Sequence, residues 1–189
     1  TTKGDTDTRP LFTIEQKGIF EKEIDKAVAA KEIDFAVHSL KDVPSQLADN
    51  LVIASIPKRE KVNDVFISSD GLSLDKIKPG SVIGTSSLRR AVQVSRQRSD
   101  VTVKPIRGNI ETRINKASGE NYDAIVLAQA GISRLGVDVN FTTLSVDDFS
   151  PSPGQGAIAI VARTDDVKTI EMLKKIEDTD SRLEIEAER

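Results

Sequence analysis

The chain has 189 residues, a formal net charge of −3 at pH 7, 30% charged residues and 38% hydrophobic residues. This composition is typical of a folded globular protein and excludes the collagen-like and intrinsically disordered classes. The sequence has no cysteine, which excludes disulfides, thiolate metal sites and thiol nucleophiles within these residues, and we expect no metal site. We see neither an apolar run of membrane-helix length nor a signal-peptide core, so we expect a cytoplasmic protein without a membrane partner.

Apolar segments separated by amphipathic ones predict an α/β fold with mixed, mainly parallel sheets. In chain order, we expect strands at residues 35–37, 51–56, 64–69, 81–85, 101–106, 123–128 and 157–162. Helices are expected at 15–30, 86–98, 109–118, 131–135 and 166–178, with a last helix starting at Ser181. In such sheets ligands bind beyond the carboxyl ends of the strands, which is where the polar loops of this sequence fall.

Basic residues are concentrated between Gly84 and Arg113, where seven lysines and arginines occur with two acidic residues. Because the whole chain is acidic, this block predicts a local anion site rather than a nucleic-acid surface. The six Phe and one Tyr lie outside the block, which disfavours stacking on bases. We therefore expect no nucleic-acid partner.

The segment Gly-Thr-Ser-Ser-Leu-Arg-Arg at 84–90 leads from a predicted strand into a predicted helix. Hydroxyl groups cap helices, and the backbone N–H groups of a helix start bind anions. Arginines in the first turn oppose the helix dipole by about 0.3–1 kcal/mol each unless an anion is present. The segment predicts an anion site, with a capped helix and solvated arginines as the alternative. If it is an anion site, Arg90→Leu should weaken ligand binding more than folding. The candidate ligands are Thr85, Ser86, Ser87, Arg89 and Arg90.

A second strand end repeats this pattern with Arg107, Gly108 and Asn109, and Arg113 follows one turn into the helix. Gly108 permits a close approach of the backbone to a ligand. Beside the first segment, these arginines predict that several anionic groups are bound on one surface.

The segment 38–44, His-Ser-Leu-Lys-Asp-Val-Pro, follows a buried strand. Asp42 could act as a general acid or base, or stabilise a developing cation, although a purely structural loop is the alternative. His38 is expected to form a structural hydrogen bond. Gln155 lies in a loop between Gly154 and Gly156. This loop is predicted to be a hinge or a ligand contact, and an ordinary turn is the alternative.

Taken together, these segments resemble the porphobilinogen deaminase family, also called hydroxymethylbilane synthases. The matching segments occur in the family's order, at residues 17–20, 38–44, 84–90, 107–113, 122–131 and 154–156. The resemblance implies a cytoplasmic transferase of haem and tetrapyrrole biosynthesis that joins four porphobilinogen molecules into hydroxymethylbilane and releases ammonia at each addition. It also implies a two-lobed fold like that of type-II periplasmic binding proteins, with an active-site cleft between the lobes.

The resemblance further implies a dipyrromethane cofactor, bound through a thioether to a cysteine of a third domain. Asp42 matches the family's catalytic aspartate, which would stabilise positive charge as the aminomethyl group leaves. The residues implied to contact the cofactor and the growing polycarboxylate chain are Asp5, Lys17, Ser39, Lys41, Asp42, Thr85, Ser86, Ser87, Arg89, Arg90, Arg107, Arg113 and Gln155.

On this basis we expect residues 1–57 and 157–178 to form domain 1, without the family's N-terminal strand and helix, and 63–150 to form domain 2. Residues 181–189 would lead into a cofactor-bearing domain 3 outside this chain, together with the attachment cysteine. The chain alone is then expected to be inactive and monomeric. A two-lobed module that binds a carboxylate solute without catalysis remains the main alternative, and a regulatory ligand-sensing domain is another.

Overall fold

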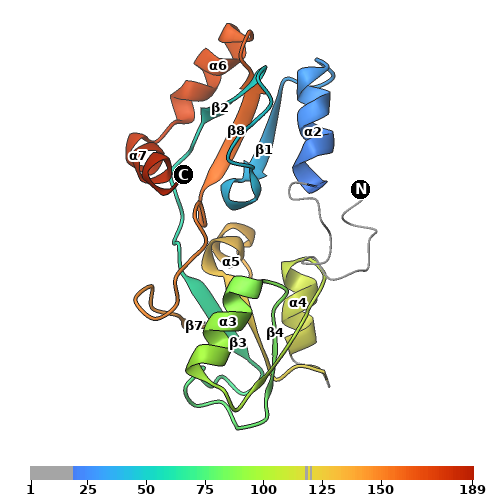
Figure 1. Cartoon of the computed structure of the whole chain (residues 1–189), viewed down its shortest axis with the longest axis vertical. Helices are drawn as coiled ribbons and strands as arrows, with labels where there is room; N and C mark the ends of the chain where they lie inside the picture. The colour runs from blue at the N-terminus through green and yellow to red at the C-terminus, as the bar shows by residue number, and fades with distance from the viewer. Residues whose placement is uncertain (1–18, 118, 120) are drawn as a thin grey trace. The chain divides into compact units, whose positions relative to one another are not determined.

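The computed structural model of the chain describes residues 19–117, 119 and 121–189 (Figure 1). The chain divides into two compact units. Among the described residues, unit 1 comprises 19–60 and 153–189, and unit 2 comprises the residues from 61 to 152. Each unit is a sheet with helices packed against it.

Unit 1 contains a three-stranded sheet in the order β1-β8-β2. The strands are β1 (Phe35–Ser39), β2 (Leu51–Ser55) and β8 (Ile158–Arg163), and both outer strands run antiparallel to β8. The helices are α2 (Ile19–Ala29), α6 (Val167–Leu173) and α7 (Thr179–Glu188), with 3-10 turns η2 (Leu40–Asp42) and η3 (Lys174–Ile176). The central strand β8 is buried almost throughout, because it has a neighbour on each side and helices nearby.

Unit 2 contains a five-stranded sheet in the order β5-β4-β6-β3-β7. The strands are β3 (Asp64–Ser68), β4 (Val82–Gly84), β5 (Thr102–Lys104), β6 (Ala124–Ala128) and β7 (Thr142–Thr143). The helices are α3 (Leu88–Gln97), α4 (Ile110–Ala117) and α5 (Gln129–Leu135). Strand β4 is parallel to β5 and β6, whereas β3 is antiparallel to β6 and β7.

Both faces of the unit 2 sheet are covered. Phe66 packs in one apolar cluster with Ile83 and Val94 of α3. Its neighbours Val65 and Ile67 pack in another cluster, which includes Ala117 of α4 and Ile132 of α5. Since successive side chains of a strand point to opposite faces, this division explains why β3 is apolar along its length.

The α/β class with mixed sheets is confirmed, but parallel pairing is less extensive than predicted. In the described part of the chain only the two pairs of β4 are parallel, and the four pairs of β3 and β8 are antiparallel. Strand β8 enters its sheet after more than a hundred intervening residues, so no crossover helix fixes its direction. The single helix expected at 166–178 is instead α6 followed by η3, and the two-residue β7 was not predicted.

Within the described ranges, no helix has the length and apolar character needed to span a bilayer.

Candidate functional site

Most of the predicted anion ligands lie at one edge of the unit 2 sheet. Strands β4, β5 and β6 are parallel neighbours, so their carboxyl ends meet at that edge, and α3, α4 and α5 follow them in turn. The loops at 85–87 and 105–109 therefore lie beside each other, as their hydrogen bonds also show. Ser86 Oγ accepts a hydrogen bond from Ile106 N at 3.0 Å and donates one to Ile106 O at 2.6 Å.

The other hydroxyl groups of the first loop also have partners within unit 2. Thr85 is buried, and its Oγ1 accepts a hydrogen bond from Ser87 N at 3.2 Å. Ser87 is the N-cap of α3, because its side chain accepts a hydrogen bond from Arg90 N. The predicted capping role of this loop is thus present in the structure.

Arg89 and Arg90 share a carboxylate that belongs to the chain itself. Arg90 donates to Asp64 Oδ1 from Nε at 3.0 Å and from Nη2 at 2.7 Å. Arg89 Nη2 lies 2.7 Å from Asp64 Oδ2, and its Nη1 also donates to Ser150 O. The Asp64 side chain is fully buried and that of Arg90 is 8% exposed. Sequence reasoning missed Asp64, although an acidic residue at the start of the apolar run Val65–Ile67 is a signal for a buried ion pair.

Arg113 is partly buried and lies close to other arginines. Burial, and then repulsion from Arg90 and Arg107, lower the pKa of Arg113. Its Nε donates to Gly108 O at 2.6 Å, which accepts without offsetting the charge. Arg89 and Arg90 thus bind Asp64, and Arg113 lies near enough to Arg90 and Arg107 to be repelled by both, so positive charge is concentrated at this edge of unit 2.

Gly108 and Asn109 shape the turn between Arg107 and Arg113. Gly108 has a φ of +121°, and a Cβ there would lie 2.6 Å from Thr112 Cγ2. Asn109 caps α4, because its Oδ1 accepts a hydrogen bond from Thr112 N at 2.8 Å. Only glycine fits this turn without strain.

The remaining described candidates lie together in unit 1. Ser39 ends β1, and Lys41 and Asp42 lie on η2; all three are exposed. The buried Leu40 fixes this turn, and its N donates to Ala157 O at 3.0 Å. A Cβ on Gly154 would overlap Leu40 Cδ2, so the loop carrying Gln155 packs directly on η2.

Gln155 itself is 1% exposed, and its carbonyl accepts a hydrogen bond from Arg59 Nε at 3.0 Å. His38 is buried, with its Nε2 2.9 Å from Asp25 Oδ1, so its expected structural hydrogen bond is present.

The described candidates thus form two groups, one in each unit. The arginine cluster of unit 2 consists of Thr85, Ser86, Ser87, Arg89, Arg90, Arg107 and Arg113. The Asp42 cluster of unit 1 consists of Ser39, Lys41, Asp42 and Gln155. Asp5 and Lys17 lie outside the described residues. Guanidinium groups suit carboxylates or phosphates, and an exposed aspartate can stabilise a cation or move a proton.

The sequence also matches a known protein family and curated relatives. A family profile described as "Porphobilinogen deaminase, dipyromethane cofactor binding domain" matches residues 1–171. The chain is 87% identical over 189 residues to the "Probable porphobilinogen deaminase" of Nitrosopumilus maritimus. That match covers all of this chain and 61% of that protein. It is 48% identical over 184 residues to the porphobilinogen deaminase of Listeria innocua, over 95% of this chain and 59% of that protein. The chain therefore spans about three fifths of the length of these curated relatives.

Among solved structures, the chain is similar to a YaeC-family lipoprotein of Enterococcus faecalis, with a TM-score of 0.49 and 14% identity. That match covers 86% of this chain and 78% of the lipoprotein.

Proposed function

Because the chain belongs to the porphobilinogen deaminase family, we propose that it provides the catalytic aspartate and the carboxylate-binding arginines of an enzyme that polymerises porphobilinogen into hydroxymethylbilane. Each addition forms one carbon–carbon bond between pyrrole units and releases one ammonia. The cytoplasmic location, the monomeric state and the division into domains at 1–57 with 157–178 and at 63–150 belong to the same proposal.

The grouping of Arg107 and Arg113 at the carboxyl-end edge of the unit 2 sheet is the observation that carries this proposal, and burial and the nearby Arg90 and Arg107 lower the pKa of Arg113. Each porphobilinogen brings an acetate and a propionate, so the ligand gains negative charge at every addition. A carboxylate bound near Arg107 and Arg113 would offset the repulsion between these guanidinium groups and would be held by their planar donors. Thr85, Ser86 and Ser87 keep the loop in place for this contact.

The arginine cluster also fits the cofactor that the family profile names. Dipyrromethane carries carboxylates of the same kind as the substrate, so Arg107, Arg113 and Lys41 would hold it by the same chemistry. When bound, the cofactor supplies the pyrrole carbon on which the chain is extended. Asp5, Lys17, Ser39 and Gln155 are further proposed contacts.

Asp42 is proposed to stabilise the positive charge that forms on the pyrrole as the amine leaves. Its carboxylate is exposed at the end of η2, on a turn fixed by the buried Leu40. A carboxylate held there would stabilise the positive charge that develops on a pyrrole nitrogen as ammonia departs. It would also exchange a proton with that nitrogen. That the Asp42 cluster and the arginine cluster act on one ligand is part of this proposal.

The test is Asp42→Asn in the full-length protein, with ammonia release and bilane formation as readouts. We expect kcat to fall by about 10²–10⁴-fold, with little change in melting temperature because Asp42 is exposed. Asp49→Asn is the matched control, since Asp49 is also an exposed aspartate of unit 1. A near-normal kcat in Asp42→Asn would remove Asp42 from the chemistry. The alternative, a solute-binding module, predicts that the wild-type protein binds pyrrole carboxylates without releasing ammonia.

A further inference from the structure

The loop that carries Arg107 is held in an unusual way. Residues 105–108 lie between β5 and α4 and belong to neither element. Each of their four consecutive carbonyl groups accepts a hydrogen bond from a side chain. The pairs are Tyr122 Oη to Pro105 O at 2.7 Å, Ser86 Oγ to Ile106 O at 2.6 Å, Lys116 Nζ to Arg107 O at 2.8 Å and Arg113 Nε to Gly108 O at 2.6 Å.

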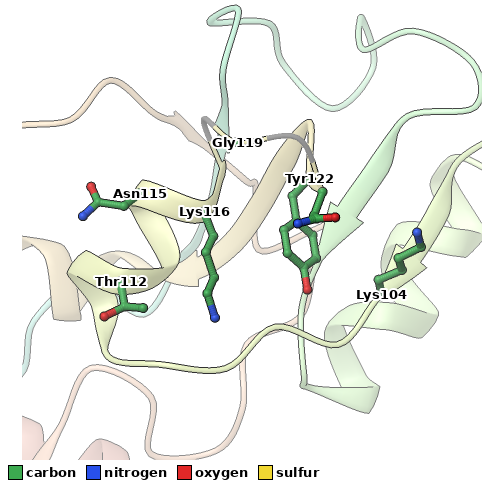
Figure 2. Close-up of a pocket in the computed structure, with 7 residues that line it drawn as sticks. Lys104, Thr112, Asn115, Lys116, Gly119 and Tyr122 are labelled. Carbon is green, nitrogen blue, oxygen red and sulfur yellow. The ribbon is translucent and has the colours of Figure 1, made fainter.

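Two of these four donors, Tyr122 and Lys116, are not part of the proposed ligand site. Both line a cavity of about 620 Å³ in unit 2, together with Lys104 and Thr112. Figure 2 shows the side chains of Lys116 and Tyr122 extending alongside each other toward the loop that leads from Lys104 to α4. These two hydrogen bonds hold the backbone on either side of the Arg107 side chain. Tyr122 binds the carbonyl of Pro105, which precedes Arg107 in the loop, and Lys116 binds the carbonyl of Arg107 itself.

The tyrosine ring is fixed by packing. A Cβ on Gly84 would lie 2.9 Å from Tyr122 Cδ1, so the absence of a side chain at the end of β4 leaves room for the ring. The ring also packs against the apolar cluster that contains Ile106 and Ile125. With the ring held, its hydroxyl has a defined position, and the bond to Pro105 O fixes the start of the loop.

We propose that Tyr122 and Lys116 are positioning residues, which hold the backbone on both sides of Arg107 so that its guanidinium group meets the ligand carboxylate. This inference rests on the proposed function, in which Arg107 binds that carboxylate. The binding of that carboxylate depends on where the guanidinium group lies, so a displaced loop should weaken binding without changing the chemical step. Removing one donor frees one carbonyl and loosens the loop without removing any ligand contact.

The test uses the full-length protein with Tyr122→Phe and Lys116→Met. Both should raise KM for porphobilinogen by about 5–10-fold, the factor expected from one lost hydrogen bond, and leave kcat within about twofold. Tyr122→Phe keeps the ring and Lys116 is exposed, so melting temperatures should change little. Lys116→Arg should restore KM because it keeps a charged donor.

Lys104→Met is the matched control, because it removes an equal charge from the same cavity and should leave KM unchanged. Arg107→Leu is the reference, and Tyr122→Phe should add no further effect in the Arg107→Leu background. An equal effect of Tyr122→Phe in both backgrounds, or an unchanged KM in the single variants while Arg107→Leu is impaired, would overturn the inference alone. An unchanged KM in Arg107→Leu would instead contradict the proposed ligand role of Arg107, and the inference with it.

Discussion

Asp64 and Arg90 form a buried ion pair across 26 residues of sequence, with Arg90 Nη2 donating to Asp64 Oδ1 at 2.7 Å. The pair joins the first turn of α3 to the first residue of β3. Arg89 binds the second oxygen of the same carboxylate at 2.7 Å. The pair therefore contributes to the structure of unit 2 as well as to the charge of the arginine cluster.

Arg90→Leu is expected to destabilise the protein. It removes one partner of the fully buried Asp64; because Arg89 still contacts this carboxylate, the loss should stay below the ~3–5 kcal/mol that an uncompensated buried charge costs. Chemical unfolding of the purified full-length variant measures this loss. Arg89→Leu should have a smaller effect, because the Arg89 side chain is 26% exposed against 8% for Arg90. Adding Asp64→Leu to Arg90→Leu should recover most of the stability; an unfolding midpoint that is unchanged in Arg90→Leu would contradict this assignment.

Gly154→Ala is expected to impair both stability and turnover. Gly154 has a φ of +72°, and a Cβ there would overlap Leu40 Cδ2 and lie 3.1 Å from Lys41 N. The variant should lose about 1–2 kcal/mol from backbone strain and about 1–3 kcal/mol more from overpacking. Displacement of η2 should also lower kcat through Asp42.

Gly71→Ala separates the two contributions to that loss. Gly71 has the same φ of +72°, but a Cβ there meets nothing within 4 Å. Thermal melts should therefore show a smaller loss of stability for Gly71→Ala than for Gly154→Ala. Activity assays should show normal turnover for Gly71→Ala. Equal losses would mean that the packing of Gly154 on η2 is unimportant.

Glu177 makes the stability of unit 1 dependent on pH. Hydrogen bonds from Arg182 lower the pKa of Glu177; burial opposes this shift, and a bond from Ile56 N adds to it. Since the folded-state pKa is below the ordinary value of about 4.3, the stabilisation is complete above that value and is lost as the pH falls through the folded-state pKa.

Glu177→Gln should therefore be less stable than the wild type at pH 7, by about 1.5–3 kcal/mol, and the difference should shrink as the pH falls below about 4. Unfolding measured from pH 3 to pH 7 tests this dependence. Glu186→Gln is the matched control, because Glu186 is 62% exposed and 4.0 Å from Arg182. A difference that stays constant over the whole range would exclude Glu177 as the titrating group.

Local sequence signals predicted local structure well. The Gly-Thr-Ser-Ser segment is predicted to cap a helix at 86–98; the cap is Ser87 and the helix is α3 at 88–97. The predicted arginines 89, 90, 107 and 113 all lie at one sheet edge, because the alternation of strands and helices places the carboxyl ends of β4 and β5 together. These relationships follow from neighbouring residues and from the geometry of parallel strands.

Long-range pairs were beyond local signals. The two arginines at the start of α3 are predicted to bind an external anion, with solvated arginines as the alternative, and Arg90→Leu is expected to affect binding more than folding. The structure places Asp64 against both of them, so we expect Arg90→Leu to affect folding as well. Likewise, Glu177 binds Ile56 N at 2.8 Å across 121 residues, and the helical segment predicted at 166–178 ends before it.

The position of β8 has a consequence for synthesis on the ribosome. Among the described residues, β1 and β2 both pair with β8, so these two pairings cannot form until Arg163 has left the exit tunnel. Unit 2, by contrast, draws its described strands and helices from one continuous stretch between residues 61 and 152. We therefore expect unit 2 to become protease-resistant first in nascent chains of increasing length. Unit 1 should stay unfolded and accessible to chaperones until β8 has been synthesised.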